Sequence, residues 1–308
     1  MTATREGAGR TTDVIAVLGA TGRIGRHVCD GLAATGAPAR ALVRDPAAAD
    51  LPIPAVHADL AQPSTLPAAL EAVDRLLLIT PHGPDQDLLE AAAIDAAAAA
   101  GVRHIVKVSG GAATLGPNGT TTTATAHWRG EQRIERSGLG FQFLRPSFFM
   151  QNLLTTVAPT VAKTGVLAAP FGRGLIAMVD VRDVAACAVA ALTAPHPVDG
   201  AWQLTGPRPV GLGTVAAHVG ARSTSVSPKL AARALQRSGA SAWEIDHALR
   251  MAAFLAGGGD SAVTDHVLRL TGTPPRSVEA FLDEHAPAFA PATGLARLLS
   301  RPSITKAA

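Results

Sequence analysis

The stretch VIAVLGATGRIGRHV, residues 14–28, decides the fold class. It opens with an aliphatic run typical of a buried strand and continues with the spacing of a helix. Gly19, Gly22 and Gly25 occupy the turn between the two. Glycine at these points permits a tight turn, lets backbone N–H groups approach a pyrophosphate, and lets the helix pack closely on the strand. The stretch therefore predicts a dinucleotide-binding turn, and the alternative is a packing turn that holds no ligand.

The following residues continue the alternation of strand and helix as far as about Val181. Each expected strand is an almost unbroken apolar run, which is typical of strands buried on both faces. Alanine-rich segments with helical spacing lie between them. We therefore predict an α/β fold with a Rossmann-type doubly wound parallel sheet. The later strands are expected at residues 39–44, 55–59, 75–80, 104–109, 140–146 and 175–180, and the helices at residues 22–36, 64–73, 85–101 and 127–138.

From about Phe148 the pattern becomes mostly helical, which indicates a smaller substrate-side lobe interleaved with the last strands. The expected division is an NAD(P)-binding Rossmann domain at residues 1–147, this lobe at residues 148–290 and a flexible tail at residues 291–308. The threonine-rich residues 120–126 are expected to form a mobile loop. Within the lobe, helices are expected at residues 148–165, 179–194 and over most of 212–290, and a strand at residues 200–206.

The composition excludes several classes of protein. The 308 residues are 47% hydrophobic and 17% charged, as in a soluble globular enzyme. The net charge is only +3 and the arginines are scattered, so no nucleic-acid partner is expected. No apolar run approaches the roughly 20 residues of a membrane span, and the first residues lack the apolar core of a signal peptide. Cys29 and Cys187 lie in apolar helical patterns and are expected as buried thiols. We expect a cytoplasmic monomer or homodimer without a membrane partner.

The end of the second expected strand bears on the choice of cofactor. NAD-binding proteins place an acidic residue there against the ribose hydroxyls, whereas this chain has Arg44. Arg23, inside the glycine turn, can reach the same position from the other side. Two guanidinium groups suit a 2′-phosphate, which favours NADP(H) over NAD(H). Asp45 is adjacent and argues for NAD(H), and either arginine could instead only cap the surface.

Several stretches together resemble one family. They are GATGRIG, ALVRDP, HADL, LLLITP, HIVKVSG, AHWRGEQRIERSGLGFQFLRPSFFMQNLL, MVDVRDVAACAVAAL and VEAFLDEHAPAF. With these motifs the chain resembles, over nearly its whole length, the NmrA-like group of atypical short-chain dehydrogenases/reductases. That group includes quinone reductases, triphenylmethane-dye and azo reductases, and cofactor-sensing regulators. The glycine turn is shared with many folds, and the run from His127 to Leu154 is the more specific part.

The resemblance implies a ligand groove built from the carboxyl ends of the strands. It places the pyrophosphate over Thr21, Gly22, Arg23 and Ile24, within the turn that Gly19 and Gly25 bound, and it places the adenine beside Asp59 and Leu60. It places the ribose and nicotinamide beside Thr80, Pro81, Ser109, Pro146, Ser147 and Phe148, and it turns Phe148, Phe149, Met150 and Asn152 toward the substrate.

The chain departs from the wider superfamily at its catalytic pair. Reductases of that superfamily use Tyr-x-x-x-Lys, in which the phenol protonates the product, but this chain contains no tyrosine. His127-x-x-x-Glu131 occupies the comparable helix. His127 is therefore the candidate proton donor, because imidazole titrates near neutral pH. Glu131 could orient its ring, or both residues could belong to a solvated helix face.

Other residues offer further alternatives at the same groove. His82, just past the fourth expected strand, is a second candidate proton donor and substrate contact. Lys107 lies in the middle of a strand and is expected as a buried stem that reaches the edge of the sheet. A metal site is not expected, because the other histidines form no ligand motif with His127 and Glu131.

These features predict an NADPH-dependent reductase of a small, apolar, conjugated substrate such as a quinone, an enone, an imine or a related carbonyl compound. Such substrates place modest demands on acid catalysis and large demands on cofactor positioning. Two alternatives stay open. The chain could be an NADP(H)-sensing regulatory protein without turnover, or a non-redox cyclase or isomerase on the same scaffold.

Overall fold

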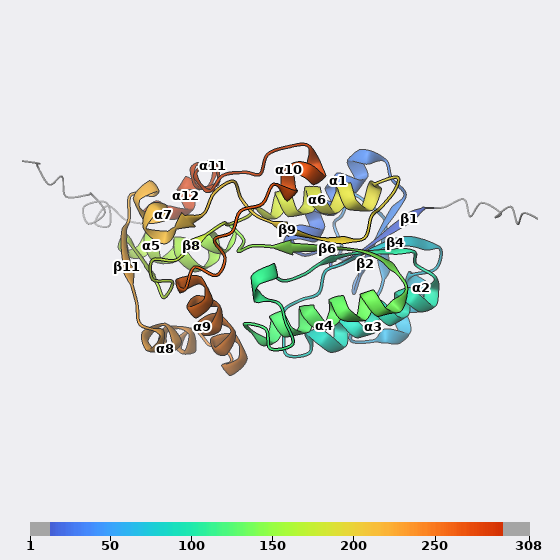
Figure 1. Ribbon diagram of the computed structural model, residues 1–308, viewed down its shortest axis with the longest axis horizontal. Helices are drawn as coiled ribbons and strands as arrows, with labels where there is room; N and C mark the ends of the chain where they lie inside the picture. The colour runs from blue at the N-terminus through green and yellow to red at the C-terminus, as the bar shows by residue number, and fades with distance from the viewer. Residues whose placement is uncertain (1–12, 292–308) are drawn as a thin grey trace, which may run out of the picture.

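The computed structural model describes residues 13–291. Seven parallel strands form one sheet in the order β3-β2-β1-β4-β5-β6-β9. Helices α1 and α6 cover one face, and α3 and α4 cover the other (Figure 1). The predicted doubly wound sheet is confirmed. Its strands are β1 Val14–Leu18, β2 Ala39–Val43, β3 Ala55–His57, β4 Val73–Leu78, β5 His104–Val108, β6 Gly140–Pro146 and β9 Gly200–Leu204, and the covering helices are α1 Arg23–Thr35, α2 Leu66–Ala69, α3 Gln86–Ala100, α4 Thr122–Ser137 and α6 Val181–Thr193.

Both faces of the sheet are packed, as the unbroken apolar strands predict. On one face Val28 of α1 and Val184 of α6 are fully buried against the sheet, and on the other Ile94 of α3 and Ile134 of α4 are buried to within 1%. A buried aliphatic side chain of this size contributes about 1.5–3 kcal/mol relative to exposure. Cys29 and Cys187 are free and buried, as expected.

Local sequence signals set the helix ends. Helices α1, α3 and α4 stop at Gly36, Gly101 and Gly138, whose φ angles of 70°, 74° and 79° are left-handed and favour glycine. Helix α4 starts at Thr122, because the Thr121 hydroxyl accepts a hydrogen bond from Ala124 N at 3.1 Å. The prediction of a mobile loop over residues 120–126 is therefore wrong from Thr122 onward.

Most of the C-terminal region packs at one end of the sheet, on the left in Figure 1, whereas α10 (His266–Thr271) packs against α6 and β9. The strand predicted at residues 175–180 is only partly correct: β8 (Leu175–Ile176) pairs antiparallel with β10 (Val210–Gly211) outside the main sheet. The strand predicted at residues 200–206 is present as β9, but it joins the main sheet beside β6 and not the smaller lobe. The remaining elements are the 3-10 helices η1 Pro63–Thr65 and η2 Ala112–Thr114, the π-helix η3 Leu153–Val157, strands β7 Val166–Ala169 and β11 Arg222–Ser225, and helices α5 Ala158–Thr164, α7 Leu212–His218, α8 Pro228–Arg237, α9 Ala242–Ala256, α10 His266–Thr271, α11 Val278–Glu284 and α12 Ala286–Phe289.

Some expectations about organisation stay predictions. The division at residues 147 and 148 is one of them, and the expected flexible tail lies, from residue 292 onward, outside the described residues. Within residues 13–291, no helix is both long enough and apolar enough to cross a membrane.

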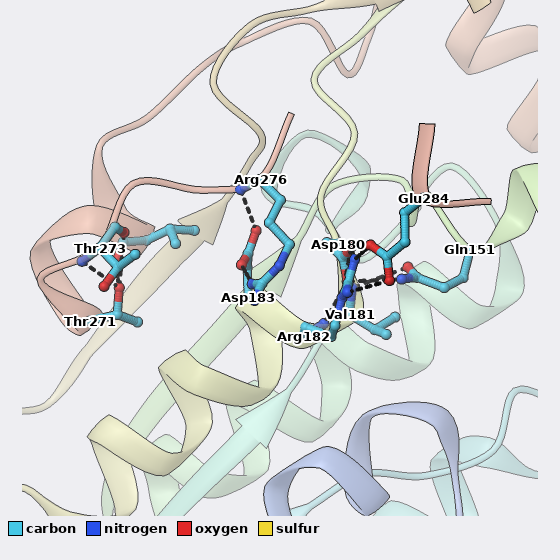
Figure 2. A network of polar contacts seen from close by, with 10 residues as sticks. Gln151, Asp180, Val181, Arg182, Asp183, Thr271, Thr273, Arg276 and Glu284 are labelled. Carbon is cyan, nitrogen blue, oxygen red and sulfur yellow. Dashed lines mark hydrogen bonds and ion pairs between the residues drawn. The ribbon is translucent and has the colours of Figure 1, made fainter. Parts of the chain in front are cut away.

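Charged side chains tie α6 to the last helices (Figure 2). Asp180 is fully buried and caps α6 through Arg182 N at 2.8 Å. It also accepts hydrogen bonds from the Arg182 guanidinium at 2.7 Å and from Gln151 Nε2 at 2.9 Å. Arg182 reaches on to Glu284 of α11 at 2.8 Å, and Asp183 pairs with Arg276. The network fixes the C-terminal segment against the α6 face of the sheet.

Replacing Asp180 by asparagine should lower the free energy of unfolding at pH 7 by about 1.5–3 kcal/mol, the contribution of hydrogen bonds to a charged group. Although burial opposes it, the hydrogen bonds from Arg182 and Gln151 lower the pKa of Asp180. The stabilisation is therefore complete above the unfolded-state pKa of about 3.9 and is lost as the pH falls below it. Urea unfolding between pH 7 and pH 3 should show the D180N deficit shrinking with acid, and a deficit constant with pH would contradict this assignment.

Candidate active site

The carboxyl ends of the parallel strands bring the predicted cofactor residues to one edge of the sheet. The glycine turn follows β1, Arg44 follows β2, and Asp59 and Leu60 follow β3. Thr80, Pro81 and His82 follow β4, and Ser109 follows β5. Strand order reverses between β1 and β4, and doubly wound sheets bind ligands at such a switch point. Pro146 ends β6 at the same edge, and Ser147, Phe148 and Phe149 follow it.

Two positions of the glycine turn have no room for a side chain, so glycine is required there. Gly19 has a φ of +85°, and a Cβ there would lie 2.6 Å from the Ile79 carbonyl oxygen. A Cβ on Gly25 would lie 2.1 Å from the Gly19 carbonyl oxygen, so α1 packs directly on the turn. Gly22 is the N-cap of α1 and supplies no side-chain cap. The first N–H groups of this 13-residue helix therefore suit an anion at the sheet edge.

The two arginines expected at the adenosine end are both exposed. Neither the Arg23 nor the Arg44 guanidinium hydrogen-bonds to any residue within 13–291. The neighbouring Asp45 is occupied differently, because its Oδ1 accepts hydrogen bonds from Ala47 N at 3.1 Å and Ala48 N at 3.3 Å. The carboxylate that argued for NAD(H) thus caps its own turn.

A buried charged cluster lies beneath the same edge. Lys107 of β5 and Glu90 of α3 are both fully buried, and His127 of α4 is 4% exposed. Lys107 Nζ lies 2.9 Å from Glu90 Oε1 and 2.8 Å from His127 Nδ1, and Glu90 Oε1 lies 3.1 Å from the same Nδ1. Thr80 Oγ1 and Gln86 Nε2 also donate to Glu90 Oε1, at 2.8 and 3.1 Å. The end of β4, strand β5 and helix α4 therefore all contact Glu90 Oε1.

The charges in this cluster follow from burial and from the ammonium group. Burial and the nearby Lys107 ammonium lower the pKa of His127, so its ring is neutral at pH 7. Burial alone would raise the pKa of Glu90, but the Lys107 ammonium group holds it far below its usual range. The cluster is consequently an ion pair of Lys107 and Glu90 beside a neutral imidazole.

Two expectations for this region need correction. Glu131 does not orient His127, because its two carboxylate oxygens accept hydrogen bonds from Arg145 Nε at 3.0 Å and from the Arg145 guanidinium at 2.5 Å. The α4 face that carries His127 and Glu131 is also not solvated, since Glu131 is only 2% exposed. Lys107 is a buried stem as predicted, and its ammonium group keeps no exposed surface.

Sequence reasoning missed Glu90 and Gln86. They lie four residues apart on α3, and both are at most 1% exposed. Residues at this spacing share one helical face. The available signal was the polar pair itself, on a face that otherwise packs Ala93, Ile94 and Ala97 against the sheet. Long charged side chains are almost never fully buried unless they are paired.

The carboxyl end of β6 contacts a further carboxyl group that sequence reasoning missed. Asp260 Oδ2 accepts hydrogen bonds from Ser147 Oγ at 2.6 Å and from Phe148 N at 2.9 Å. Burial raises the pKa of Asp260. Phe148, Phe149 and Asn152 are partly exposed, whereas Met150 is fully buried in the core of the C-terminal region. The Met150 side chain therefore lies in the core and offers no surface to a substrate, contrary to the expectation for it.

Aromatic side chains lie next to the buried cluster. The exposed His82 ring packs edge-on to His127 with centroids 5.6 Å apart, and it lies 5.9 Å from His247 of α9. His247 stacks on Trp243 at 5.3 Å. Helix α9 thus reaches His82, at the carboxyl end of β4, from the C-terminal region. The described part of the chain holds no group of three histidine, cysteine or acidic side chains placed to bind a metal ion.

Comparison with known proteins places this geometry in a family. A family model described as NAD(P)H-binding matches residues 19–195. The chain is 38% identical to the NAD(P)H azoreductase of Xenophilus azovorans over 293 residues, which cover 90% of this chain and 99% of the relative. It is 34% identical to a (4-alkanoyl-5-oxo-2,5-dihydrofuran-3-yl)methyl phosphate reductase of Streptomyces griseus, over 90% of this chain and 100% of the relative.

Two solved structures also resemble this chain over most of its length. The NADPH complex of the Escherichia coli NADPH-dependent quinone oxidoreductase superposes with a TM-score of 0.80 at 27% identity, over 88% of this chain and 99% of that chain. The triphenylmethane reductase of Citrobacter sp. superposes with a TM-score of 0.77 at 22% identity, over 88% of this chain and 99% of that chain, and shares the fold. The chain belongs to the NAD(P)H-binding, NmrA-like family of atypical short-chain dehydrogenases/reductases, a family of oxidoreductases.

Proposed function

We propose that the protein is an NADPH-dependent reductase of a small, apolar, conjugated substrate such as a quinone, an azo compound, an enone or an imine. One observation carries the proposal. The glycine turn after β1 and the Lys107–Glu90–His127 cluster behind β4 and β5 lie along the same edge of the sheet. A dinucleotide across this edge has its diphosphate at the turn and its nicotinamide in the half built from β4, β5 and β6.

The residues present fit NADPH along the whole edge. The N–H groups from Gly22 to Ile24 suit the diphosphate, and Asp59 and Leu60 would border the adenine. Thr80, Pro81, Ser109, Pro146 and Ser147 would border the nicotinamide ribose and ring. Ser109 Oγ supports this assignment, because it is buried and has no hydrogen-bond partner within residues 13–291. When bound, NADPH supplies the hydride.

The relatives support the substrate class. They are reductases of azo compounds, of a furanone phosphate and of quinones, all conjugated acceptors of a hydride. In this chain the proposed substrate contacts are Phe148, Phe149, Asn152 and His82, since they follow β4 and β6 and remain partly or fully exposed. Apolar walls with a few polar groups are usual for such ligands.

A panel of acceptors tests the proposal. Oxidation of NADPH should be measured with a quinone, an azo dye, an unsaturated furanone and an imine. Turnover of at least one acceptor is expected. NADPH that binds tightly but is oxidised by none of them would overturn the proposal and favour a cofactor-sensing protein. Product formed without oxidation of NADPH would indicate a cyclase or isomerase.

Replacing Arg44 by glutamine should weaken NADPH binding by about 10- to 100-fold and leave NADH binding within about twofold. A hydrogen bond to a charged group contributes about 1.5–3 kcal/mol, and each 1.4 kcal/mol is a factor of ten in affinity. Arg44 is exposed, and within residues 13–291 its guanidinium has no partner that would compete with a 2′-phosphate. Calorimetric titration with both cofactors measures the effect.

Arg40 provides a matched control on β2, the strand that Arg44 follows. Its guanidinium donates to the Glu71 carbonyl oxygen at 2.7 Å, so Arg40→Gln removes the same charge from β2 without removing a free donor. NADPH affinity should change less than about threefold in this variant. Equal losses in R40Q and R44Q would point to general electrostatic attraction and not to a phosphate contact.

A further inference from the structure

The buried ion pair beside His127 needs an explanation. Moving two charges out of water costs several kcal/mol per ion, and a buried pair seldom adds net stability compared with apolar residues of similar volume. Lys107 and Glu90 nevertheless keep none of their side-chain surface exposed. Groups buried at such a cost beside a titratable side chain cluster at functional sites. The geometry of the contacts indicates what this pair does.

The contacts fix the tautomer of the His127 ring. An ammonium group has only donors, so Lys107 Nζ at 2.8 Å donates to Nδ1. Glu90 Oε1 does not need a proton from Nδ1, because it already accepts three hydrogen bonds, from Thr80, Gln86 and Lys107. Gln86 Nε2 is 3.1 Å from both ring nitrogens and so does not select between them. The ring proton therefore lies on Nε2.

The protonated side of the ring faces the end of β5. A Cβ on Gly110 would lie 3.3 Å from Cδ2 of His127, the ring carbon bonded to Nε2. Nδ1 faces the opposite way, toward Lys107. The His127 side chain keeps 5% of its surface exposed, which leaves a narrow approach for a ligand atom. Gly110 directly follows Ser109, which we place beside the nicotinamide.

We propose, resting on the reductase function above, that Lys107 is a proton source that acts on the substrate through His127. When the hydride reaches the substrate, an oxygen or nitrogen of the substrate gains an electron pair. The Nε2–H bond of His127 breaks and that proton joins the substrate atom, while an Nζ–H bond of Lys107 breaks and its proton joins Nδ1. The product is neutral, His127 is again a neutral ring but with its proton on Nδ1, and Lys107 is a neutral amine. After the product leaves, a proton from water joins Nε2 while the Nδ1 proton returns to Lys107 Nζ, which restores the ammonium group and the starting tautomer.

In this protein Lys107 supplies the cation that the lysine of the Tyr-x-x-x-Lys pair supplies in the wider superfamily. There a lysine four residues after the tyrosine assists the phenol, whereas here Glu131 occupies that position and is held by Arg145. The cation comes instead from β5. Glu90 acts as a positioning residue, because it holds the ammonium within 2.9 Å and keeps it charged before the reaction.

The first experiment reads the tautomer without turnover. Two-bond proton–nitrogen NMR of the histidine rings distinguishes the two neutral tautomers and the charged ring, and comparison with His127→Gln assigns the signal. In the unmodified protein at pH 7, the signal should show a neutral ring with its proton on Nε2. A proton on Nδ1, or a charged ring, overturns the relay.

The second experiment separates hydride transfer from proton transfer. Reduction of a quinone or an azo dye needs a hydride and a proton, whereas reduction of a cationic triphenylmethane dye needs only a hydride. The double variant K107M/E90Q removes the proton source and keeps the core neutral. Its kcat should fall about 100-fold with the quinone or azo dye, in line with general acid catalysis, and less than about threefold with the cationic dye.

Glu131→Gln is the matched control, because it removes one buried carboxylate from α4 without touching Lys107 or Glu90. Its ratio of quinone to cationic-dye activity should equal that of the unmodified protein. Equal losses with both classes of acceptor in K107M/E90Q would overturn the relay while leaving the reductase function standing. If NADPH binds but neither class is reduced by the unmodified protein, the reductase function fails and the relay fails with it.

Discussion

Replacing Lys107 by methionine should lower the free energy of unfolding by about 3–5 kcal/mol. Methionine fills similar space, so the loss comes from the charge and not from a cavity. Glu90 would remain fully buried with Thr80 and Gln86 as donors but with no cation. Urea unfolding at pH 7 measures the effect, and a loss below about 1 kcal/mol would mean that Glu90 is protonated in the native protein.

The double variant K107M/E90Q is the control for this loss. Replacing a buried ion pair by uncharged groups of similar volume often leaves stability unchanged or increases it. Most of the free energy of unfolding lost in K107M should therefore return. E90Q alone should be strongly destabilised, since it leaves Lys107 without a carboxylate. A double variant as unstable as the sum of the two single variants would show that the two residues do not interact, contrary to their separation of 2.9 Å.

The K107M protein should also respond to pH in the opposite direction to the unmodified protein. In the unmodified protein the pKa of Glu90 is depressed, so the stability it contributes is present above the unfolded-state pKa of about 4.3 and is lost as the pH falls below it. Without the ammonium, burial raises the pKa of Glu90 and the native state binds a proton more readily than the unfolded chain. The deficit of K107M should then shrink as the pH is lowered from 7 toward 5.

The sheet and the turn were predictable because their signals are local. Strand β6 matches its predicted bounds, residues 140–146, and β9 was recognised as a strand despite the helices around it. Central strands such as β5, which is buried along its whole length, are recognisable because burial on both faces requires apolar residues. Strand β9 lies at the edge of the sheet, and of its residues only Leu204 is buried. Parallel strands all end at one edge, so the sequence also indicated which residues meet there. The roles of those residues in cofactor binding stay predictions.

The interior of the site was not predictable because its contacts are long-range. Lys107 and His127 were each noticed, but nothing in the spacing of the chain shows that a side chain from β5 passes between α3 and α4 to reach a histidine. Glu131 was considered as a partner of His127 because it lies one helical turn away, but its carboxylate instead accepts a hydrogen bond from Arg145 of β6. Asp260 reaches Ser147 from a segment more than 100 residues away.

The prediction of a strand at residues 175–180 failed for a related reason. The apolar run 175–180 has the composition of a core strand, yet only β8 pairs, and Val179 makes a single bridge to Phe149. Apolar composition reports burial and does not identify the partner strand. The loop predicted at residues 120–126 failed because threonine disfavours helix interiors only weakly, and the Thr121 cap together with the buried Ala124 and Ala126 outweighs that preference.

Replacing Gly25 by alanine should weaken NADPH binding by about 10- to 100-fold, or by more if the turn rearranges. The added methyl group would lie 2.1 Å from the Gly19 carbonyl oxygen and 2.7 Å from Ala20 Cα, and both of these atoms belong to the backbone. A side chain could rotate away, but here α1 must move off the turn. Overpacking of this kind costs about 1–3 kcal/mol, and the displaced N–H groups are those proposed to hold the diphosphate.

Gly213→Ala is the control for the Gly25 variant. Gly213 lies within α7, no heavy atom lies within 4 Å of the position that a Cβ would take there, and alanine favours a helix over glycine. This variant should bind NADPH as the unmodified protein does and should be as stable or slightly more stable. Titration calorimetry with NADPH, paired with thermal unfolding of each free protein, separates loss of binding from loss of folding. A G25A protein that folds normally and binds NADPH with unchanged affinity would show that the turn does not hold the diphosphate, and the cofactor would then need another site on the sheet edge.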